Sequence, residues 1–328
     1  MEYRTLGKNG PRVSLLGFGC GAIGGLLVKG DPSEQRRAVA RALEAGINYF
    51  DTAPAYGNGK SEETIGPLLR ELNADVVIGT KFRLEPEQLP NAADAIRSQL
   101  EASLKRLGRD SVDLFNLHNR VGVDVSGNQG ALSEEDVLGP VAEGLAKVRE
   151  AGLTRLIGIT GLGDPAALHR VVGSGLFDSV QTYVNAINPS AGWEVKGGSA
   201  QNFDRLLDKM AEVGAGGVGI RILAAGALAG TPLEARHQNA GDPGRGLTAG
   251  GEYVDDLERG RRLGELAAEL GLESAAELSY RLVIGHPGLA TALVGASEYS
   301  QMEDAIRWVE RGPLDATVAQ RVAAMAGS

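Results

Sequence analysis

The chain has 328 residues, of which 43% are hydrophobic and 23% charged, and its formal net charge is −9. This composition is ordinary for a globular enzyme and argues against extended disorder. An acidic chain lacks the basic face that nucleic acid requires, and neither an apolar leader nor an apolar run of about 18 residues occurs. One cysteine, Cys20, and four histidines leave no internal disulfide and little material for a metal site. We therefore expect a cytoplasmic protein that binds neither nucleic acid, nor a membrane, nor a metal.

Eight apolar runs recur along the chain, and segments with helical spacing separate them. Each run is continuous rather than alternating, which is typical of parallel strands covered on both faces. The expected strands are Val13–Gly19, Ile47–Asp51, Val76–Lys81, Val112–His118, Arg155–Thr160, Ser179–Asn185, Val218–Leu223 and Leu289–Val294. Eight strand–helix units can close into a barrel without a free edge. The sequence therefore predicts an α/β fold, a (β/α)8 TIM barrel, with residues 1–328 as a single domain.

Helix signals and a turn signal support this periodicity. Asp31-Pro32-Ser33-Glu34 combines a capping carboxylate with a proline at the first helical position, and Asp164-Pro165 opens the fifth helix similarly. Lys8-Asn9-Gly10 predicts a hairpin turn between Tyr3–Leu6 and Arg12–Leu16, which would cap the barrel floor. A last helix is expected at Leu314–Ala326.

Three long connections follow the fourth, sixth and seventh expected strands. They span Val121–Glu134, Ala186–Ser199 and Gly226–Val254. Connections of this length in a compact domain usually carry function. All three would lie on the C-terminal face of the barrel, where active sites of this architecture are found.

Four residues with acid–base or charge chemistry lie at neighbouring strand ends: Asp51, Tyr56, Lys81 and His118. A phenol, an ammonium, a carboxylate and an imidazole together make a proton donor with its tuning groups. The Lys81 ammonium would lower the pKa of the Tyr56 phenol from its usual value of about 10, and Asp51 would hold Lys81 in place. His118 would orient a substrate oxygen.

Each of these residues taken alone has a structural explanation. Asp51 could cap a helix, Lys81 could extend its ammonium to the surface, Tyr56 could pack in its loop, and His118 could be a hydrogen-bonded core residue. The occurrence of all four at successive strand ends favours a shared site.

The residues around these positions resemble the aldo-keto reductase family. The resemblance rests on GINYFDTAPAYGNGKSEETIG at 46–66, VVIGTKF at 76–82 and DLFNLHN at 113–119, and it extends over essentially the whole chain. It implies an (α/β)8 barrel that binds NAD(P)H in extended form and passes hydride between nicotinamide and a carbonyl or alcohol. By residue match, Tyr56 is the general acid/base, Lys81 and Asp51 its tuning pair, and His118 the substrate-orienting group. IGITGL at 157–162 resembles the branch with L-galactose dehydrogenase and other sugar dehydrogenases.

The resemblance also assigns cofactor contacts at later strand ends. Thr160 and Gln181 would meet the nicotinamide carboxamide as acceptor and donor, although Thr160-Gly161 replaces the family's common Ser-Asn. Arg221 replaces an aromatic residue that often stacks under nicotinamide. It could bind pyrophosphate, an acidic or hydroxylated substrate, or a structural carboxylate.

VGASEYSQMEDA at 294–305 resembles the family's segment that holds the adenosine phosphate. Gly295, Ala296 and Ser297 offer backbone donors near the start of the last barrel helix. Many relatives have a basic residue shortly after that serine, whereas here Glu298 is acidic and Gln301 is neutral. Glu298 would repel a 2′-phosphate and accept from ribose hydroxyls, so NAD is expected in preference to NADP.

A different fold is suggested by Gly19-Cys20-Gly21-Ala22-Ile23-Gly24, a literal GxGxxG that follows a strand, with Asp51 ending the next strand. Gly25, Gly30 and Pro32 argue against a helix at the third glycine. We therefore expect a loop at the barrel mouth, with Gly19, Cys20 and Gly21 beside the cofactor.

Alternative functions remain open at this point. Lys81 could form a Schiff base in a lyase, or the barrel could bind nicotinamide as a non-catalytic sensor. A metal-dependent hydrolase is disfavoured, because HExxH is absent and His169, His237 and His286 are not paired at ligand spacing. Trp193 could stack on a sugar face or simply pack. The substrate, the direction of reaction and the oligomeric state are not determined by the sequence.

Overall fold

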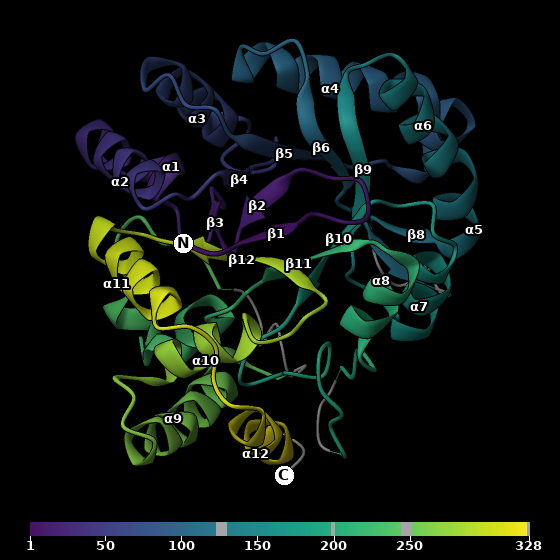
Figure 1. The fold of residues 1–328 in the computed structure, drawn as a ribbon. Helices are drawn as coiled ribbons and strands as arrows, with labels where there is room; N and C mark the ends of the chain where they lie inside the picture. Colours follow the sequence, from purple (N-terminus) through teal and green to yellow (C-terminus); the bar gives the residue numbers. More distant parts are fainter. Residues whose placement is uncertain (123–129, 198–200, 244–250, 327–328) are drawn as a thin grey trace.

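The computed structural model describes residues 1–122, 130–197, 201–243 and 251–326. Eight parallel strands close into a barrel in the order β10-β11-β12-β3-β4-β5-β6-β9, with helices around it (Figure 1). The barrel strands are β3 (Leu16–Gly19), β4 (Tyr49–Asp51), β5 (Val77–Phe82), β6 (Val112–Leu117), β9 (Thr154–Thr160), β10 (Ser179–Tyr183), β11 (Gly216–Ile220) and β12 (Leu289–Gly295). The predicted (β/α)8 barrel is confirmed.

Helices follow the barrel strands and cover their outer faces. They are α1 (Leu26–Lys29), α2 (Pro32–Glu44), α3 (Lys60–Glu71), α4 (Ala92–Leu107), α5 (Glu134–Asp136), α6 (Ala142–Glu150), α7 (Pro165–Gly173), α8 (Leu206–Val213), α9 (Tyr253–Glu269), α10 (Ala275–Val283), α11 (Tyr299–Glu310) and α12 (Ala316–Ala326), with short helical turns at Pro86–Asn91, Val137–Val141, Ala224–Ala229 and Leu233–Ala235. Both expected caps form: Asp31 accepts from the Ser33 amide at 2.8 Å, and Asp164 from the Ala167 amide at 2.8 Å. These side chains satisfy amide groups that the first helical turn leaves unpaired.

The N-terminal hairpin consists of β1 (Tyr3–Thr5) and β2 (Arg12–Ser14), which pair antiparallel. It lies across the end of the barrel (Figure 1), where Leu6 and Val13 are fully buried and the Lys8 amide donates to the Gly214 carbonyl at 2.7 Å. The expected first strand, Val13–Gly19, is therefore two strands. The Ser14 hydroxyl donates to the Leu16 carbonyl at 2.6 Å at this break, which lets the chain leave the hairpin and enter the barrel.

Two further boundaries differ from the sequence prediction. β11 begins two residues earlier than expected, at Gly216, and ends at Ile220 because Arg221 adopts a left-handed φ of 61°. A helix also forms before Asp31: the four-residue α1 starts after Gly25, whose φ is 82°, and ends at Gly30. No helix starts at the third glycine, Gly24, as expected, but the short helix that follows it was not predicted.

The three long connections follow β6, β10 and β11, as expected. The first contains strands β7 (Arg120–Gly122) and β8 (Ala131–Ser133), which pair parallel. Residues 123–129, 198–200 and 244–250 of these connections lie outside the described part of the chain. Within the described part, no helix is both long and apolar enough to span a bilayer.

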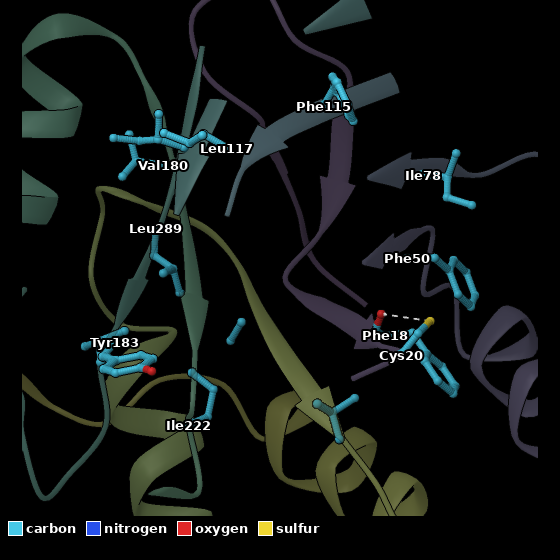
Figure 2. Close-up of a cluster of buried hydrophobic side chains, with 14 of the residues drawn as sticks. Phe18, Cys20, Phe50, Ile78, Phe115, Leu117, Val180, Tyr183, Ile222 and Leu289 are labelled. Atoms are coloured by element: carbon cyan, nitrogen blue, oxygen red, sulfur yellow. Dashed lines mark hydrogen bonds between the residues drawn. The ribbon is translucent and has the colours of Figure 1, made fainter. Parts of the chain in front are cut away.

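The barrel has an outer apolar layer and a graded interior. Outward-facing Phe18 and Phe50 stack with ring centres 5.3 Å apart, within the buried cluster of Figure 2. Inside, Leu114 of β6 lies beside Leu156 of β9, and two residues further along the same strands Asn116 lies beside Gly158. Side chains on one face recur every second residue, so the interior changes from apolar near the hairpin to polar at the carboxyl ends of the strands. This change places the polar residues at the barrel mouth.

Candidate active site

A cavity of about 510 Å³ opens at the carboxyl ends of the barrel strands. Its volume is in the range usual for small-molecule sites. Around its inner end lie Asp51, Tyr56, His118, Thr160 and Gln181, and its other end reaches α11. The strand ends therefore bring three of the four predicted catalytic residues, and the pair predicted to bind a carboxamide, to one cavity.

Lys81 lies under this cavity and is fully buried. Its Nζ donates to Oδ2 of Asp51 at 2.5 Å, to the carbonyl of Thr52 at 2.9 Å and to Oη of Tyr56 at 3.2 Å. Burial alone would lower the pKa of the lysine, but the adjacent Asp51 carboxylate and Tyr56 raise it above its ordinary value. Lys81 is therefore an ammonium ion with all three protons engaged.

Asp51 joins the two sides of the barrel. While Oδ2 accepts from Lys81, Oδ1 accepts from Nε2 of Gln181 at 2.5 Å, although the two residues are 130 positions apart in the sequence. An ionised carboxylate only accepts, so this contact fixes the orientation of the Gln181 amide. The carbonyl oxygen and the second N–H of Gln181 then remain for a ligand, so the side chain can both accept and donate there.

Tyr56 is held in a tight turn between β4 and α3. Gly57, Asn58 and Gly59 all have positive φ, which reverses the chain directly into α3. The phenol ring lies edge-on to His118, with ring centres 5.9 Å apart. Burial raises the pKa of Tyr56 above its ordinary value, and the Lys81 ammonium only partly opposes this effect. Lys81 therefore lowers the pKa as expected, but the unpredicted effect of burial is larger, and the phenol is neutral and protonated near pH 7.

His118 follows β6 directly, and its backbone amide donates to the Phe82 carbonyl at 2.8 Å. Burial lowers the pKa of the imidazole well below its ordinary value, and the charges of Lys81 and Arg83 lower it further. His118 is therefore a neutral imidazole that can donate one hydrogen bond and accept another.

Most of the residues expected to contact the cofactor line the cavity, but two of them do not. Residues that line the cavity are Gly19, Gly21, Thr160, Gln181, Arg221, Gly295, Ser297 and Gln301. Cys20 and Glu298 do not line it. The Cys20 thiol lies 3.9 Å from the Phe18 carbonyl (Figure 2), and burial raises its pKa, so it is an unreactive core residue.

The residues expected to lie near the adenosine phosphate form a local hydrogen-bond chain. The Ser297 amide and hydroxyl donate to Oε1 of Gln301 at 2.9 and 3.2 Å, and Nε2 of Gln301 lies 3.4 Å from Oε1 of Glu298. Glu298 thus contacts the cavity-lining Gln301 but does not line the cavity itself. The backbone donor expected at Ser297 is engaged by Gln301.

Trp193 lies away from the cavity. Its ring meets that of His286 edge-on, with centres 5.2 Å apart, and His286 precedes β12 at the hairpin end of the barrel. The predicted substrate contact of Trp193 is wrong, because its loop returns to the opposite end of the barrel. Packing, the other explanation considered, accounts for this residue.

Several cavity residues were missed by the sequence analysis. Among them are Arg83, Tyr183, Arg236, His237 and Asp304. Two could have been found, because Arg83 follows Lys81, and Tyr183 follows Gln181, by the two-residue spacing that keeps strand residues on one face. The described ranges contain no group of three or more His, Cys, Asp or Glu side chains placed to hold a metal ion.

The architecture defines a class: a closed eight-stranded barrel with its polar residues at the carboxyl ends of the strands, as in TIM-barrel enzymes. Residues 15–326 match the profile of the Aldo/keto reductase family. The chain therefore belongs to the aldo/keto reductase family.

Three relatives illustrate this membership. The chain is 33% identical over 165 residues to an L-galactose dehydrogenase of Arabidopsis thaliana, a match that covers 49% of each chain. It is 27% identical over 328 residues to an L-glyceraldehyde 3-phosphate reductase of Escherichia coli (strain K12), covering 94% of this chain and 87% of that one. The holo form of aldo-keto reductase AKR11C1 from Bacillus halodurans has the same fold, with a TM-score of 0.72 at 24% identity, covering 98% and 95% of the two chains.

Proposed function

We propose that this protein is an NAD(P)-dependent oxidoreductase that transfers hydride between nicotinamide and a carbonyl or alcohol substrate. The substrates considered are aldoses, secondary alcohols, aldehydes and ketones. The observation that carries the proposal is the position of the Tyr56 hydroxyl, which lines the cavity, lies 3.2 Å from Nζ of Lys81 and belongs to a ring that meets His118. The names of the relatives, a sugar dehydrogenase and an aldehyde reductase, support the same reaction type.

The residues at the strand ends fit a nicotinamide group. Oγ1 of Thr160 is buried, lines the cavity and has no hydrogen-bond partner among the described residues. Burying an unpaired hydroxyl is unfavourable, so a ligand that bonds to it would stabilise this arrangement. Thr160 and the carbonyl oxygen of Gln181 would hold the carboxamide, and Gly19 and Gly21 would allow close approach of the dinucleotide.

The nicotinamide, when bound, supplies or accepts the hydride. Tyr56 then acts on the substrate oxygen. In reduction, negative charge develops on the carbonyl oxygen as its carbon gains the hydride, and Oη gives its proton to complete the alcohol. The resulting phenolate lies beside the Lys81 ammonium, which stabilises it until solvent returns a proton. In oxidation the phenolate removes the alcohol proton.

His118 positions the same oxygen. A neutral imidazole can donate one N–H to it and so fix the carbonyl next to Oη of Tyr56. Its depressed pKa keeps it from carrying a charge into the cavity at neutral pH.

NAD is the cofactor we propose in preference to NADP. Glu298 contacts Gln301, and Asp304 lines the cavity from the same helix. Two carboxylates at this end would repel a 2′-phosphate, whereas they can accept hydrogen bonds from ribose hydroxyls.

A Schiff-base lyase is disfavoured by the state of Lys81. Such a nucleophile needs a neutral amine, but this one is an ammonium held by three acceptors. Borohydride treatment with substrate is therefore expected to leave Lys81 unmodified.

The test is a panel of aldoses, secondary alcohols, aldehydes and ketones, assayed with both nicotinamides by the absorbance of the reduced cofactor. Turnover that requires Tyr56 supports the proposal. Cofactor binding without turnover of any compound in either direction would instead support the sensor function and contradict ours.

A further inference from the structure

Arg221 occupies a strained position directly after β11. Its φ of 61° is in the left-handed region, which costs a residue with a side chain about 1 kcal/mol or more. The backbone is held there by its own carbonyl, which accepts from Nδ2 of Asn185 at 2.9 Å and from the Ala224 amide at 2.8 Å. Strain that the surroundings maintain in this way is concentrated at functional sites.

The guanidinium of Arg221 is directed to the cavity. Arg221 lines it, and Cζ lies 5.8 Å from the ring centre of Tyr183, which lines it too. Nη1 is buried without a hydrogen-bond partner, and no described carboxylate forms an ion pair with this residue. A buried donor of a cation that lacks an acceptor is unfavourable, and the structural explanation, a buried ion pair, does not account for Arg221 within the described part of the chain.

The charge of Arg221 lies at the end of the cavity that holds Tyr56 and His118. Arg221 lies close enough to Tyr56 to oppose the burial-induced rise in the pKa of the phenol. Arg83 lines the same end, where its charge acts on His118. The carboxylate there, Asp51, is already paired with Lys81. This end therefore carries excess positive charge in a protein whose net charge is −9.

A third arginine of the cavity, Arg236, has a different role. Arg236 donates from Nη1 to the Ala225 carbonyl and from Nη2 to the Gly241 carbonyl, so its fork is used in holding loop backbone. Arg221 thus keeps a buried donor, Nη1, without a partner among the described residues, whereas both terminal nitrogens of Arg236 are engaged.

We infer that Arg221 binds an anionic group of the substrate, a carboxylate or a phosphate, so that the preferred substrate is an acid or a phosphate ester rather than a neutral sugar or alcohol. A guanidinium matches both anions with paired N–H donors, and a positive pocket concentrates anions. The inference rests on the proposed oxidoreductase function and names the substrate class of that site.

The test compares matched substrates that differ in charge: glucuronate with glucose, and glyceraldehyde 3-phosphate with glyceraldehyde. The first pair tests carboxylate and the second tests phosphate. For the wild type, kcat/KM is expected to favour the charged member of at least one pair. Arg221→Gln is expected to lower kcat/KM for that charged member by about 10- to 100-fold, the usual loss of a hydrogen bond to a charged group, and for its neutral partner by less than about threefold. Arg221→Lys retains the charge but lacks the paired N–H donors of a guanidinium. Its kcat/KM for the charged member is expected to lie between those of the wild type and Arg221→Gln.

Two controls separate this effect from others. Arg155→Gln removes an exposed charge on β9 outside the cavity. It is expected to leave kcat/KM unchanged for both members of each substrate pair. The Kd of NAD+ is measured for each variant. An Arg221→Gln variant that binds NAD+ more weakly, with an unchanged ratio of charged to neutral substrates, would assign Arg221 to the cofactor pyrophosphate and overturn the inference.

A binding measurement distinguishes failure of the inference from failure of the proposed function. The wild-type complex with NAD+ is titrated calorimetrically with succinate and with inorganic phosphate. Binding that Arg221→Gln abolishes would support the anion site even if no compound is turned over, in which case the oxidoreductase proposal alone fails. The inference would be overturned if the wild type turns over substrates without preferring either charged one and binds neither anion. The proposed function would then still stand. The wild-type results decide this even if Arg221→Gln does not fold.

Discussion

Nζ of Lys81 lies 2.5 Å from Oδ2 of Asp51, and the two side chains are only 1% and 4% exposed. Withdrawing two charges from water is costly, and their attraction offsets that cost only while both are present. The same pair fixes Lys81 beside Tyr56, so it links the stability of the barrel mouth to its chemistry.

Removing one member of this pair is predicted to destabilise the protein strongly. Lys81→Met leaves the Asp51 carboxylate buried without its cation, which should lower the free energy of unfolding by about 3–5 kcal/mol. The double variant Asp51→Asn/Lys81→Met should be more stable than Lys81→Met, because no uncompensated charge remains. Urea unfolding measures both. Arg97→Ala, which breaks the exposed pair with Glu101, is the control and should cost no more than about 1 kcal/mol. A double variant less stable than Lys81→Met would contradict this account.

The raised pKa of Tyr56 predicts opposite pH profiles for the two directions of reaction. A raised pKa keeps the phenol protonated to higher pH, so reduction, which needs the proton, should hold its rate through neutral pH and fall only above about pH 10. Oxidation needs the phenolate, so its rate should rise about tenfold per pH unit below that pKa. His118 stays neutral over this range and should add no inflection near pH 6.5. Initial rates in both directions test this, and an inflection near pH 6.5 that disappears in His118→Gln would show that the imidazole titrates.

Glu298→Arg is predicted to shift cofactor choice toward NADP. The substitution replaces a carboxylate beside Gln301 by a cation that can pair with the 2′-phosphate, and a change of about tenfold in the ratio of the two Kd values is expected. Quenching of tryptophan fluorescence measures both constants. Glu310→Arg, at the opposite end of α11, makes the same change of charge and should leave the ratio unaltered. An unchanged ratio in Glu298→Arg would remove this residue from cofactor selection.

Trp193→Phe is predicted to affect stability rather than activity. The ring packs on His286 at the hairpin end of the barrel, so its truncation should lower the free energy of unfolding by about 1–3 kcal/mol. Because the residue does not line the cavity, kcat/KM should stay within about twofold of the wild type. A selective rise in the KM of Trp193→Phe for a sugar substrate would instead support a contact between Trp193 and the sugar.

The sequence predicted what depends on local pattern. Continuous apolar runs identified the barrel strands, and the polar residues after those runs were Asp51, Lys81 and His118, because parallel strands bring their carboxyl ends to one face. Asp31 and Asp164 were recognised as caps because the capping motif spans a few adjacent residues.

What the sequence did not predict depends on contacts between distant segments. The bond from Gln181 to Asp51 joins residues 130 positions apart and fixes the orientation of the glutamine amide. The pKa of Tyr56 is governed first by burial, which the whole barrel mouth determines and no neighbouring residue reveals. Asp304 of α11 lines the cavity together with residues of distant strands and loops, so its contribution could not be inferred from its own segment.

The central claim is that Oη of Tyr56, beside the Lys81 ammonium, exchanges a proton with the substrate oxygen. The most direct test is the single-turnover rate of cofactor oxidation with a carbonyl substrate, for the wild type and Tyr56→Phe, together with the Kd of the cofactor. We predict that Tyr56→Phe slows this step by about 10²- to 10⁴-fold, the usual contribution of a general acid, while the Kd changes by less than about twofold. A Tyr56→Phe variant that retains a third or more of the wild-type rate would contradict the claim.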